Sequence, residues 1–596
     1  MAGVFRQAIT LFIFWLTLFA SFRPVFWLWQ PGMQEVNLPD FAACFLHGLY
    51  MDASLAGYFT LLPLLISAFR RFIPSKFIKQ LLQAYHLILT PFAALIYIAD
   101  LEIFRLWGHH TDSALVPYLA FPREALASTL SAPWHLLFPL WLVFSASWIF
   151  IWTRIHNRMQ QISIPGTAGS FTALLLAGAC IIPIRGGLQL APMNQSSVYF
   201  SDRRILNQAA ENPIWVFGQS LMEDHRNELQ SLYCRADPNK ARAFCDSLYY
   251  DRSKTEMVLN RKRPNVVLII WESLSAKVAG CTGGNFPSTP QLDKLASDGL
   301  LFTRMYANGD RSDKGLVSIL SGQPAFGKIS LMSHPSLSAG FDFLSKRFEK
   351  LGYSSQYFYG GELEFANMKS FLIHAGYDKL TGKDDFPAES WNSKWGAHDE
   401  VVLNRQLQEA GIAKEPFFHT VFTLSSHEPF EVPGIQNQPN TPPDSLFCRA
   451  HRYTDRCLGD WVKMAEKQPW WNNTLVIVIA DHGHAQPGNS GESDPEKFHI
   501  PMLWFGPALK SKGNILRMGN QTDLFATLCR QLGDTTGLPA FSKNLLSDGS
   551  KDFAFFAFRN GCALLEPSGI QTHFDEESKD NAACLFRQWA YRKIYP

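Results

Sequence analysis

Five long apolar stretches dominate the first 190 residues, a region that is poor in charge and rich in Leu, Phe and Trp. Each stretch is long enough to cross a bilayer, which takes about 20 apolar residues. The first has no small-x-small cleavage site after it, and further apolar stretches follow, so it is not typical of a cleaved signal peptide. The pattern predicts five transmembrane helices in a domain of residues 1–189, rather than a large buried helical domain. The predicted spans are residues 7–29, 45–69, 80–106, 132–153 and 169–187.

Basic residues are concentrated in alternate loops between these stretches. Arg70, Arg71, Lys76 and Lys79 lie between the second and third stretches, whereas the loops after the first and third hold few basic residues, chiefly Arg123. Basic loops stay in the cytoplasm, so we expect a cytoplasmic N-terminus and, after five spans, an external position for everything beyond about residue 190. The sequence therefore predicts a protein of the cytoplasmic (inner) membrane with a periplasmic or extracellular C-terminal domain.

Residues 190–262 form a predicted connector without a catalytic signature. Within it, residues 212–221 have the pattern of an amphipathic helix. Such a helix can lie along a membrane surface.

After Pro264 the pattern changes to one of alternating strands and helices. Val266–Ile270 and Leu475–Ala480 are unbroken apolar, β-branched runs, which are typical of central strands covered on both faces. Helical patterns such as residues 289–299 and 342–351 lie between them. Residues 263–596 are therefore predicted to form an α/β domain with a mostly parallel central sheet, which binds ligands at the carboxyl ends of its strands.

Length, charge and cysteine content narrow the class of protein. The 596 residues favour two or three domains. The formal charge is +2, and no Lys/Arg stripe with interleaved aromatics is present, so nucleic acid is not an expected partner. None of the ten cysteines has Cys-x-x-Cys spacing, which leaves disulfides or buried thiols, and we expect at least one disulfide. The closely spaced pairs are Cys234 and Cys245, Cys448 and Cys457, and Cys562 and Cys584.

Candidate chemistry follows the predicted strands. Glu272 comes directly after the first apolar run, and Asp481 and His482 come directly after the second. Ser312 follows a Gly-containing turn and precedes an apolar helical run. At a helix N-terminus a hydroxyl lies where unpaired N–H groups favour an alkoxide or a phosphate. Two carboxylates, an imidazole and a hydroxyl suit one divalent ion, Zn²⁺ or Mn²⁺ more than Mg²⁺. Each motif taken singly also fits a structural turn, such as an Asp-His-Gly turn with a capping Asp.

The motifs together resemble a known family. The C-terminal part resembles the alkaline phosphatase/sulfatase superfamily, and the whole chain is similar to lipoteichoic acid synthase-type proteins, which have five membrane spans, a linker and an external sulfatase-like domain. The resemblance is carried by residues 265–273, by residues 288–299, by Arg311-Ser-Asp-Lys-Gly315 leading to residues 320–324, by residues 423–429 and by residues 480–483.

This resemblance implies roles for four residues. Family members use Glu, Thr, Asp and His to hold one divalent ion, with the Thr as nucleophile, which implies Glu272, Ser312, Asp481 and His482 here. The nucleophile position holds Ser instead of Thr, and the β-methyl that restricts χ1 of Thr is therefore missing. Sulfatases that form formylglycine carry Cys or Ser followed by x-Pro-x-Arg. Asp-Lys-Gly-Leu follows Ser312, which argues against sulfate esters.

Further residues are candidates for substrate contact. The resemblance implies that His427 contacts the substrate headgroup, that Trp395 borders it, and that His499 is a substrate contact or a second-ion ligand. Arg311 flanks the nucleophile and is able to pair with phosphate oxygens. For His427 the alternative is a loop histidine packed beside Pro429.

The expected activity is transfer of a phosphoglycerol-type headgroup. Phosphatidylglycerol is the phospholipid donor that the resemblance implies, Ser312 forms a covalent intermediate, and a glycan or lipid accepts the group. Phosphoethanolamine transfer is the nearest alternative. A phosphodiesterase or sulfatase-type hydrolase and a non-catalytic, lipid-sensing relative are the other classes.

Overall fold

A computed structural model describes most of the chain. The described residues are 2–69, 74–115, 132–159, 166–189, 191–223, 233, 236–251, 253–435, 438, 441–577 and 580–595. Of the residues named above, Arg70, Arg71, Arg123 and Cys234 lie outside this description. The chain divides into two compact units, Met1–His225 and Arg226–Pro596. The division falls within the segment predicted to be a connector.

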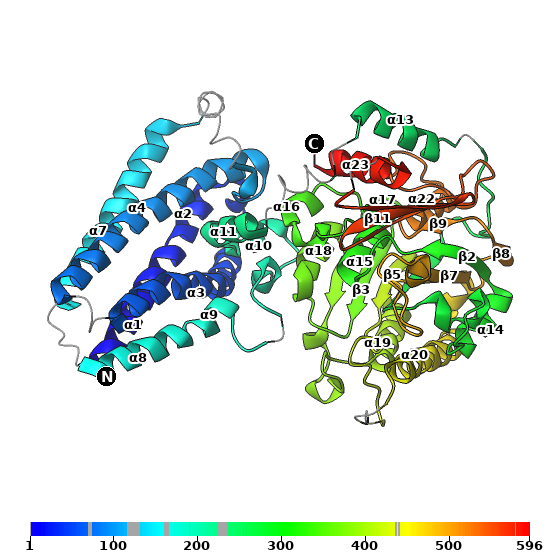
Figure 1. Cartoon of the computed structure of the whole chain (residues 1–596), viewed down its shortest axis with the longest axis horizontal. Helices are drawn as coiled ribbons and strands as arrows, with labels where there is room; N and C mark the ends of the chain where they lie inside the picture. Colours follow the sequence, from blue (N-terminus) through cyan, green and yellow to red (C-terminus); the bar gives the residue numbers. More distant parts are fainter. Residues whose placement is uncertain are drawn as a thin grey trace. The chain divides into compact units, whose positions relative to one another are not determined.

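The described part of the first unit is helical, and most of it lies in long helices (Figure 1). Within the described residues, five helical segments are long and apolar enough to cross a membrane: Gly3–Trp29, Leu38–Ala68, Lys76–Arg105, Trp134–Arg158 and Thr167–Arg185. The prediction of five spans is confirmed, with ends that differ by several residues. The helices of the unit are α1 (Ala2–Ala20), α2 (Phe22–Trp29), α3 (Leu38–Ala68), α4 (Ser75–Trp107), α7 (Trp134–Met159), α8 (Gly166–Ala179), α9 (Ile181–Arg185), α10 (Arg204–Ala210) and α11 (Pro213–Glu223).

A buried polar cluster ties α2, α3 and α4 to the corner between α10 and α11. Arg23 forms an ion pair with Asp52 and donates a hydrogen bond to the Ala210 carbonyl at 2.8 Å. The side-chain amide of Asn212 donates to Asp52 and to the hydroxyl of Tyr97, each at 2.8 Å. The segment predicted to lie along a membrane surface is therefore fastened into the first unit by hydrogen bonds to buried groups.

The second unit is built around one large mixed sheet. Its strand order is β4-β3-β5-β1-β6-β7-β2-β8, and β9 pairs with β2. Only β7 runs antiparallel to its neighbours, β6 and β2. A mostly parallel sheet is therefore confirmed. The strands are β1 (Asn265–Trp271), β2 (Leu300–Tyr306), β3 (Ser354–Tyr359), β4 (Lys379–Thr381), β5 (Phe417–Phe422), β6 (Thr474–Ala480), β7 (His499–Phe505), β8 (Gly513–Ile515) and β9 (Gly519–Asn520).

Helices cover both faces of this sheet, which explains its unbroken apolar strands: every residue of β1, β5 and β6 is buried. In Figure 1, α14, α19 and α20 gather on one side of the strands, and α15, α17, α18 and α22 on the other. Their bounds are α14 (Pro290–Asp298), α15 (Ser312–Ser321), α17 (Leu344–Lys350), α18 (Met368–Ala375), α19 (Asp399–Ile412), α20 (Pro443–Ala465) and α22 (Asp523–Gln531). This unit also contains α13 (Pro238–Tyr249), α16 (Pro335–Ser338) and α21 (Pro495–Phe498).

A second sheet of three antiparallel strands closes the chain. It contains β10 (Ala554–Phe558), β11 (Gly561–Glu566) and β12 (Gly569–Phe574), and α23 (Ala582–Ile594) packs on it. Hydrogen bonds join its first strand to the loop that precedes Ser312, since Ala557 N–H donates to the Asn308 carbonyl at 2.9 Å. Sequence patterns did not predict this contact.

The expected disulfides are not formed between the described cysteines. Cys448, Cys457 and Cys562 are free thiols. Cys448 and Cys457 lie on the single helix α20. Nine residues of helix separate two Cα atoms by about 13 Å, whereas a disulfide needs about 4.4–6.8 Å. Close spacing in the sequence therefore gave a wrong prediction of a disulfide here, because the helix holds the two cysteines too far apart.

The buried ion pair in the first unit leads to a stability prediction. Asp52→Ala leaves the Arg23 guanidinium buried without its carboxylate, which we expect to destabilise the protein by about 3–5 kcal/mol. Asp40→Ala is the matched control on the same helix, because Asp40 pairs with Arg203 at 3.4 Å in an exposed position. That loss should stay below about 1 kcal/mol. Thermal unfolding of the full chain in detergent compares the two, and equal losses would contradict the role given to Asp52.

Candidate metal and nucleophile site

Glu272 is held rigidly at the carboxyl end of β1. Its backbone N–H donates to the hydroxyl of Thr423 at 2.9 Å, and its carbonyl accepts from the hydroxyl of Ser426 at 2.6 Å. The residue is only 3% exposed. The loop after β5 therefore fixes the backbone from which this carboxylate extends.

The pairing of β1 with β6 brings the second carboxylate beside the first. The two strands are parallel and Trp271 pairs with Ala480, so Glu272 and Asp481 leave neighbouring strands at the same level. Ser273 turns away with φ 58° and donates its N–H to Asp481 Oδ1 at 2.7 Å. Such a left-handed backbone is uncommon for serine, and here it presents that N–H to the carboxylate.

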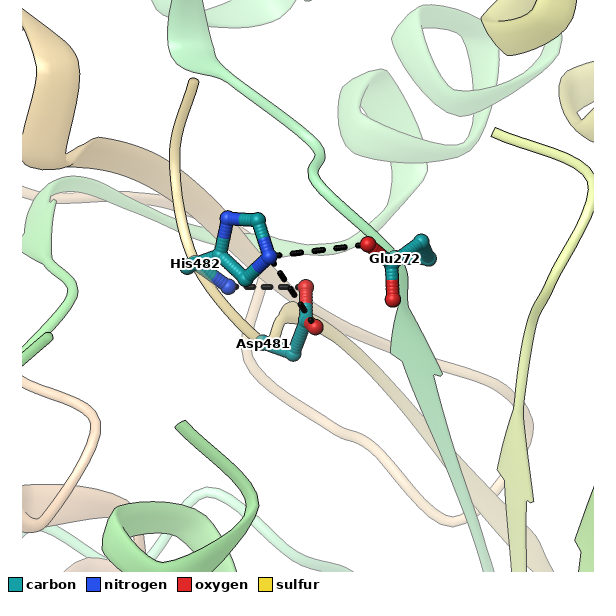
Figure 2. Close-up of side chains that lie close together, drawn as sticks. All are labelled: Glu272, Asp481 and His482. Carbon is teal, nitrogen blue, oxygen red and sulfur yellow. Dashed lines mark hydrogen bonds and ion pairs between the residues drawn. The ribbon is translucent and has the colours of Figure 1, made fainter. Parts of the chain in front are cut away.

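His482 faces both carboxylates (Figure 2). Its Nε2 lies 3.5 Å from Glu272 Oε1 and 3.6 Å from Asp481 Oδ2. Its Nδ1 donates to the Gly483 carbonyl at 2.7 Å, which fixes the ring and leaves Nε2 toward the acids. One ligand atom from each of the three residues lies within 4.8 Å of the others.

Ser312 is the first residue of α15, as the sequence predicts. Its hydroxyl donates to Glu272 Oε2 at 3.1 Å. The close approach of α15 to the end of β6 depends on Gly315, because a Cβ at this position would lie 1.7 Å from the Asp481 carbonyl oxygen. Glycine in the Ser-Asp-Lys-Gly run thus lets the helix N-terminus reach the acid cluster.

The two buried carboxylates of this cluster need positive charge beside them. Burial and the neighbouring Glu272 carboxylate raise the pKa of Asp481. Burial alone would raise the pKa of Glu272 as well, but the hydrogen bond and charge of His482 lower it. Burial would lower the pKa of His482, yet the two carboxylates raise it to about 10. A protonated imidazole thus supplies the positive charge that two buried carboxylates need.

A divalent ion fits the same place. Asp481 Oδ2 is buried and has no hydrogen-bond partner among the described residues, which leaves one carboxylate oxygen open to a ligand. Buried polar atoms of this kind are rare unless an ion or water completes them. Carboxylate oxygens with one imidazole nitrogen suit Zn²⁺ or Mn²⁺. Glu272, Asp481 and His482, with Ser312 beside them, therefore fit the predicted ligand set.

Gln521 was missed by sequence reasoning although it links the two halves of the site. Its side-chain amide donates to the carbonyls of Ala480 and Asp481 at 2.7 and 2.6 Å, and its oxygen accepts from Asn308 N–H at 3.0 Å. It is fully buried. The only signal in the sequence is a polar run, Asn-Gln-Thr-Asp, just before an amphipathic helix.

Two of the predicted substrate residues, His427 and Trp395, pack against each other. The rings of His427 and Trp395 pack edge to face with centroids 4.7 Å apart. His427 directly follows Ser426, whose hydroxyl donates to the Glu272 carbonyl. Trp395 Nε1 donates to the Glu428 carbonyl at 2.6 Å, so the indole is held in place. Both side chains are partly exposed and available to a substrate.

Arg311 and His499 complete the predicted set. Arg311 is exposed directly beside Ser312. His499 begins β7, where its Nε2 donates to the Thr303 carbonyl at 2.8 Å and its ring stacks on Tyr306. Among the described residues it does not join the ligand cluster. A substrate or second-ion role for His499 stays a prediction.

Comparisons with known proteins identify relatives of this chain. Residues 264–534 match the protein family described as Sulfatase. Phosphoglycerol transferase I of Xanthomonas campestris pv. campestris (strain B100) is 26% identical over 319 residues, 50% of this chain and 45% of that protein. The lipoteichoic acid synthase-like YvgJ of Bacillus subtilis (strain 168) is 22% identical over 525 residues, 81% of each chain. The chain thus spans about half the length of the phosphoglycerol transferase it matches.

A solved structure supports the fold. A protein in the alkaline phosphatase superfamily from Vibrio parahaemolyticus superposes with a TM-score of 0.54 at 26% identity, and the match covers 61% of this chain and 98% of that chain. The match therefore extends over nearly the whole of that protein.

The close approach at Gly315 can be tested by mutation. Gly315→Ala forces a methyl against a backbone carbonyl that cannot move aside, so we expect a loss of about 1–3 kcal/mol in stability together with weaker metal binding. Gly411→Ala on α19 is the control, because nothing lies within 4 Å of the added Cβ. Alanine there should be neutral or stabilising. Thermal unfolding of the full chain measures both, and an unaffected Gly315→Ala variant would refute the constraint.

Metal removal tests the ligand set. After chelation and titration with Mn²⁺, the full chain should bind one ion, and Glu272→Gln or Asp481→Asn should weaken binding by about 100-fold or more. His499→Gln should keep the same stoichiometry, because its imidazole already bonds to a backbone carbonyl. Metal analysis by mass spectrometry gives the count. A second ion that disappears in His499→Gln would instead support the second-ion role.

Proposed function

We propose that this chain, whose residues 264–534 form a sulfatase domain of the alkaline phosphatase superfamily, is a membrane-bound, metal-dependent phosphotransferase. One observation carries the proposal: the Ser312 hydroxyl, at the N-terminus of α15, donates to Glu272 inside a buried cluster of two carboxylates and an imidazole. A hydroxyl so placed is activated by its neighbours and faces the N–H groups of a helix end.

Ser312 acts as the nucleophile in two displacements. In the first, its Oγ bonds to the phosphorus of a phospholipid headgroup, and the bond from phosphorus to the diacylglycerol oxygen breaks. Diacylglycerol leaves as an alcohol, because its oxygen takes up the proton that the Ser312 hydroxyl gives up. In the second, an acceptor hydroxyl bonds to phosphorus, the Ser312 Oγ–P bond breaks, and the proton of the acceptor is released as Ser312 regains its own.

Several residues assist these steps. Glu272 holds the Ser312 hydroxyl in place, and the first N–H groups of α15 stabilise negative charge on the phosphoryl group. Glu272, Asp481, His482 and Ser312 would hold a divalent ion, which would lower the pKa of the hydroxyl and neutralise phosphoryl charge. His427 protonates the leaving group or binds the phosphate, while Trp395 and Arg311 border the headgroup.

The donor in this proposal is phosphatidylglycerol, and the product is a phosphoglycerol-substituted glycan or lipid. The similarity to phosphoglycerol transferase I supports the headgroup, and five helices able to cross a membrane support a phospholipid source. The sulfatase domain acts outside the cytoplasmic membrane, in the periplasm or beyond it.

The covalent intermediate provides the test. Full-length protein in vesicles that contain phosphatidylglycerol should gain the mass of phosphoglycerol on Ser312, and Ser312→Ala should gain none. Ser312→Thr is the matched control, because it keeps the hydroxyl and should still form the adduct. Intact-protein mass spectrometry with peptide mapping locates the added mass.

Other outcomes separate the alternative functions. An adduct with the mass of phosphoethanolamine would identify phosphatidylethanolamine as the donor in place of phosphatidylglycerol. Release of glycerol phosphate with no modified acceptor would favour a hydrolase. Absence of both adduct and headgroup release would refute the proposal and leave a non-catalytic role.

A further inference from the structure

Asp399 is a buried carboxylate that lies outside the metal and nucleophile site. It is the first residue of α19 and is fully buried. Its Oδ1 accepts the backbone N–H groups of Leu424 at 2.7 Å and of Ser425 at 3.1 Å, and its Oδ2 accepts the hydroxyl of Thr454 at 2.5 Å. Both carboxylate oxygens are therefore paired, as a buried charge requires.

The two N–H groups belong to the loop that fixes Glu272. They come from the middle of the run of residues 423–426. At the ends of this run, Thr423 accepts from the Glu272 N–H at 2.9 Å and Ser426 donates to the Glu272 carbonyl at 2.6 Å. Asp399 therefore holds the two inner residues of a run whose two outer residues hold the proposed metal ligand.

The same loop leads into the predicted headgroup residues. The N–H of His427 donates to the Leu424 carbonyl at 3.0 Å. The ring of His427 packs on Trp395, whose indole donates to the Glu428 carbonyl at 2.6 Å. Because Asp399 holds the N–H of Leu424, it fixes the residue from which this turn starts.

Asp399 is itself held in place from several directions. Its own N–H donates to Ser425 Oγ at 3.0 Å. Just before it, the Ala397 N–H donates to the Gly360 carbonyl at 3.0 Å, and a Cβ on Gly360 would lie 2.1 Å from the Ala397 carbonyl oxygen. Thr454 belongs to α20, which packs beside α19 (Figure 1). The carboxylate thus extends from a closely packed support.

The partners of Asp399 distinguish it from an ordinary acidic residue at the start of a helix. Such a residue usually serves the N–H groups or the dipole of its own helix. The three hydrogen bonds that the Asp399 carboxylate accepts come instead from residues 25, 26 and 55 positions away in the chain. Its side chain therefore serves the loop of residues 423–427 and α20 rather than α19.

We infer that Asp399 is a positioning residue, whose carboxylate acts through the loop of residues 423–427 to set the positions of Glu272 and His427. The inference rests on the proposed function where it concerns turnover, whereas its effect on metal binding needs no turnover. Residues that orient a metal ligand from outside typically change metal affinity by about 10- to 100-fold.

Titration of the metal-free full chain in detergent with Mn²⁺ tests this role. Asp399→Leu removes the acceptor of two buried N–H groups, so Mn²⁺ affinity should fall about tenfold or more. Asp399→Asn keeps an oxygen for both N–H groups and an amide that donates to the Thr454 hydroxyl, so its affinity should stay within about threefold of the wild type. If asparagine is as damaging as leucine, or if neither variant changes the affinity, the inference fails.

Asp455 provides the matched control. It is also buried, and its carboxylate accepts the N–H groups of Gln291 and Leu292 at the start of α14, both at 2.8 Å. Asp455→Leu therefore leaves two similar N–H groups unpaired, but on α14 instead of the loop. It should lower the unfolding temperature and keep the wild-type Mn²⁺ affinity. An equal loss of affinity in both leucine variants, measured where both are folded, would contradict a positioning role.

The rate of Ser312 adduct formation tests the part of the inference that concerns turnover. At saturating Mn²⁺, Asp399→Leu should still slow the adduct by about tenfold or more, because small displacements near a reacting group cost rate even when the ion is bound. Asp455→Leu should keep the wild-type rate. A wild-type rate in Asp399→Leu would overturn the role given to it for His427. Absence of the adduct in the wild type would count against the proposed function, and the Mn²⁺ titrations would still decide the role of Asp399.

Discussion

Two buried carboxylates that share one small volume are the constraint on which the rest of the site depends. Glu272 and Asp481 repel each other, and neither is compatible with a buried position unless positive charge lies between or beside them. The parallel pairing of β1 and β6 makes their closeness unavoidable, because Trp271 and Ala480 are register partners. His482 supplies positive charge, because the two carboxylates raise its pKa to about 10, and a divalent ion would satisfy the same demand more fully.

Close packing and hydrogen bonds connect these two carboxylates to segments that are distant in the sequence. Gly315 lets α15 meet the Asp481 carbonyl, and Gln521 joins that carbonyl to the loop of Asn308. Asn308 in turn donates a hydrogen bond to β10 of the three-stranded sheet. Ser312 is therefore positioned by contacts from segments that are far apart in sequence. A displacement in any of them would move the hydroxyl relative to Glu272, and small displacements near a reacting group have large kinetic effects.

The predictable parts of this arrangement are those with local signals. Glu272 and Asp481 follow unbroken apolar runs, and runs of this kind become buried parallel strands whose ends meet at one edge. Gln521 has no such signal, because its role arises from contacts between distant segments. The cysteine pairs show the opposite error: Cys448 and Cys457 are close in the chain but lie on one helix, which keeps them apart.

Ser312 shows how the site compensates for the serine at this position. Threonine would restrict its own χ1 through its β-methyl, and serine has no such restraint. The orientation of the hydroxyl therefore depends on its hydrogen bond to Glu272 and on the fixed start of α15. Glu272 is itself fixed through its backbone by Thr423 and Ser426. These hydrogen bonds thus supply the rigidity that a methyl group would give. Both the loop after β5 and the helix that carries Ser312 therefore position the nucleophile.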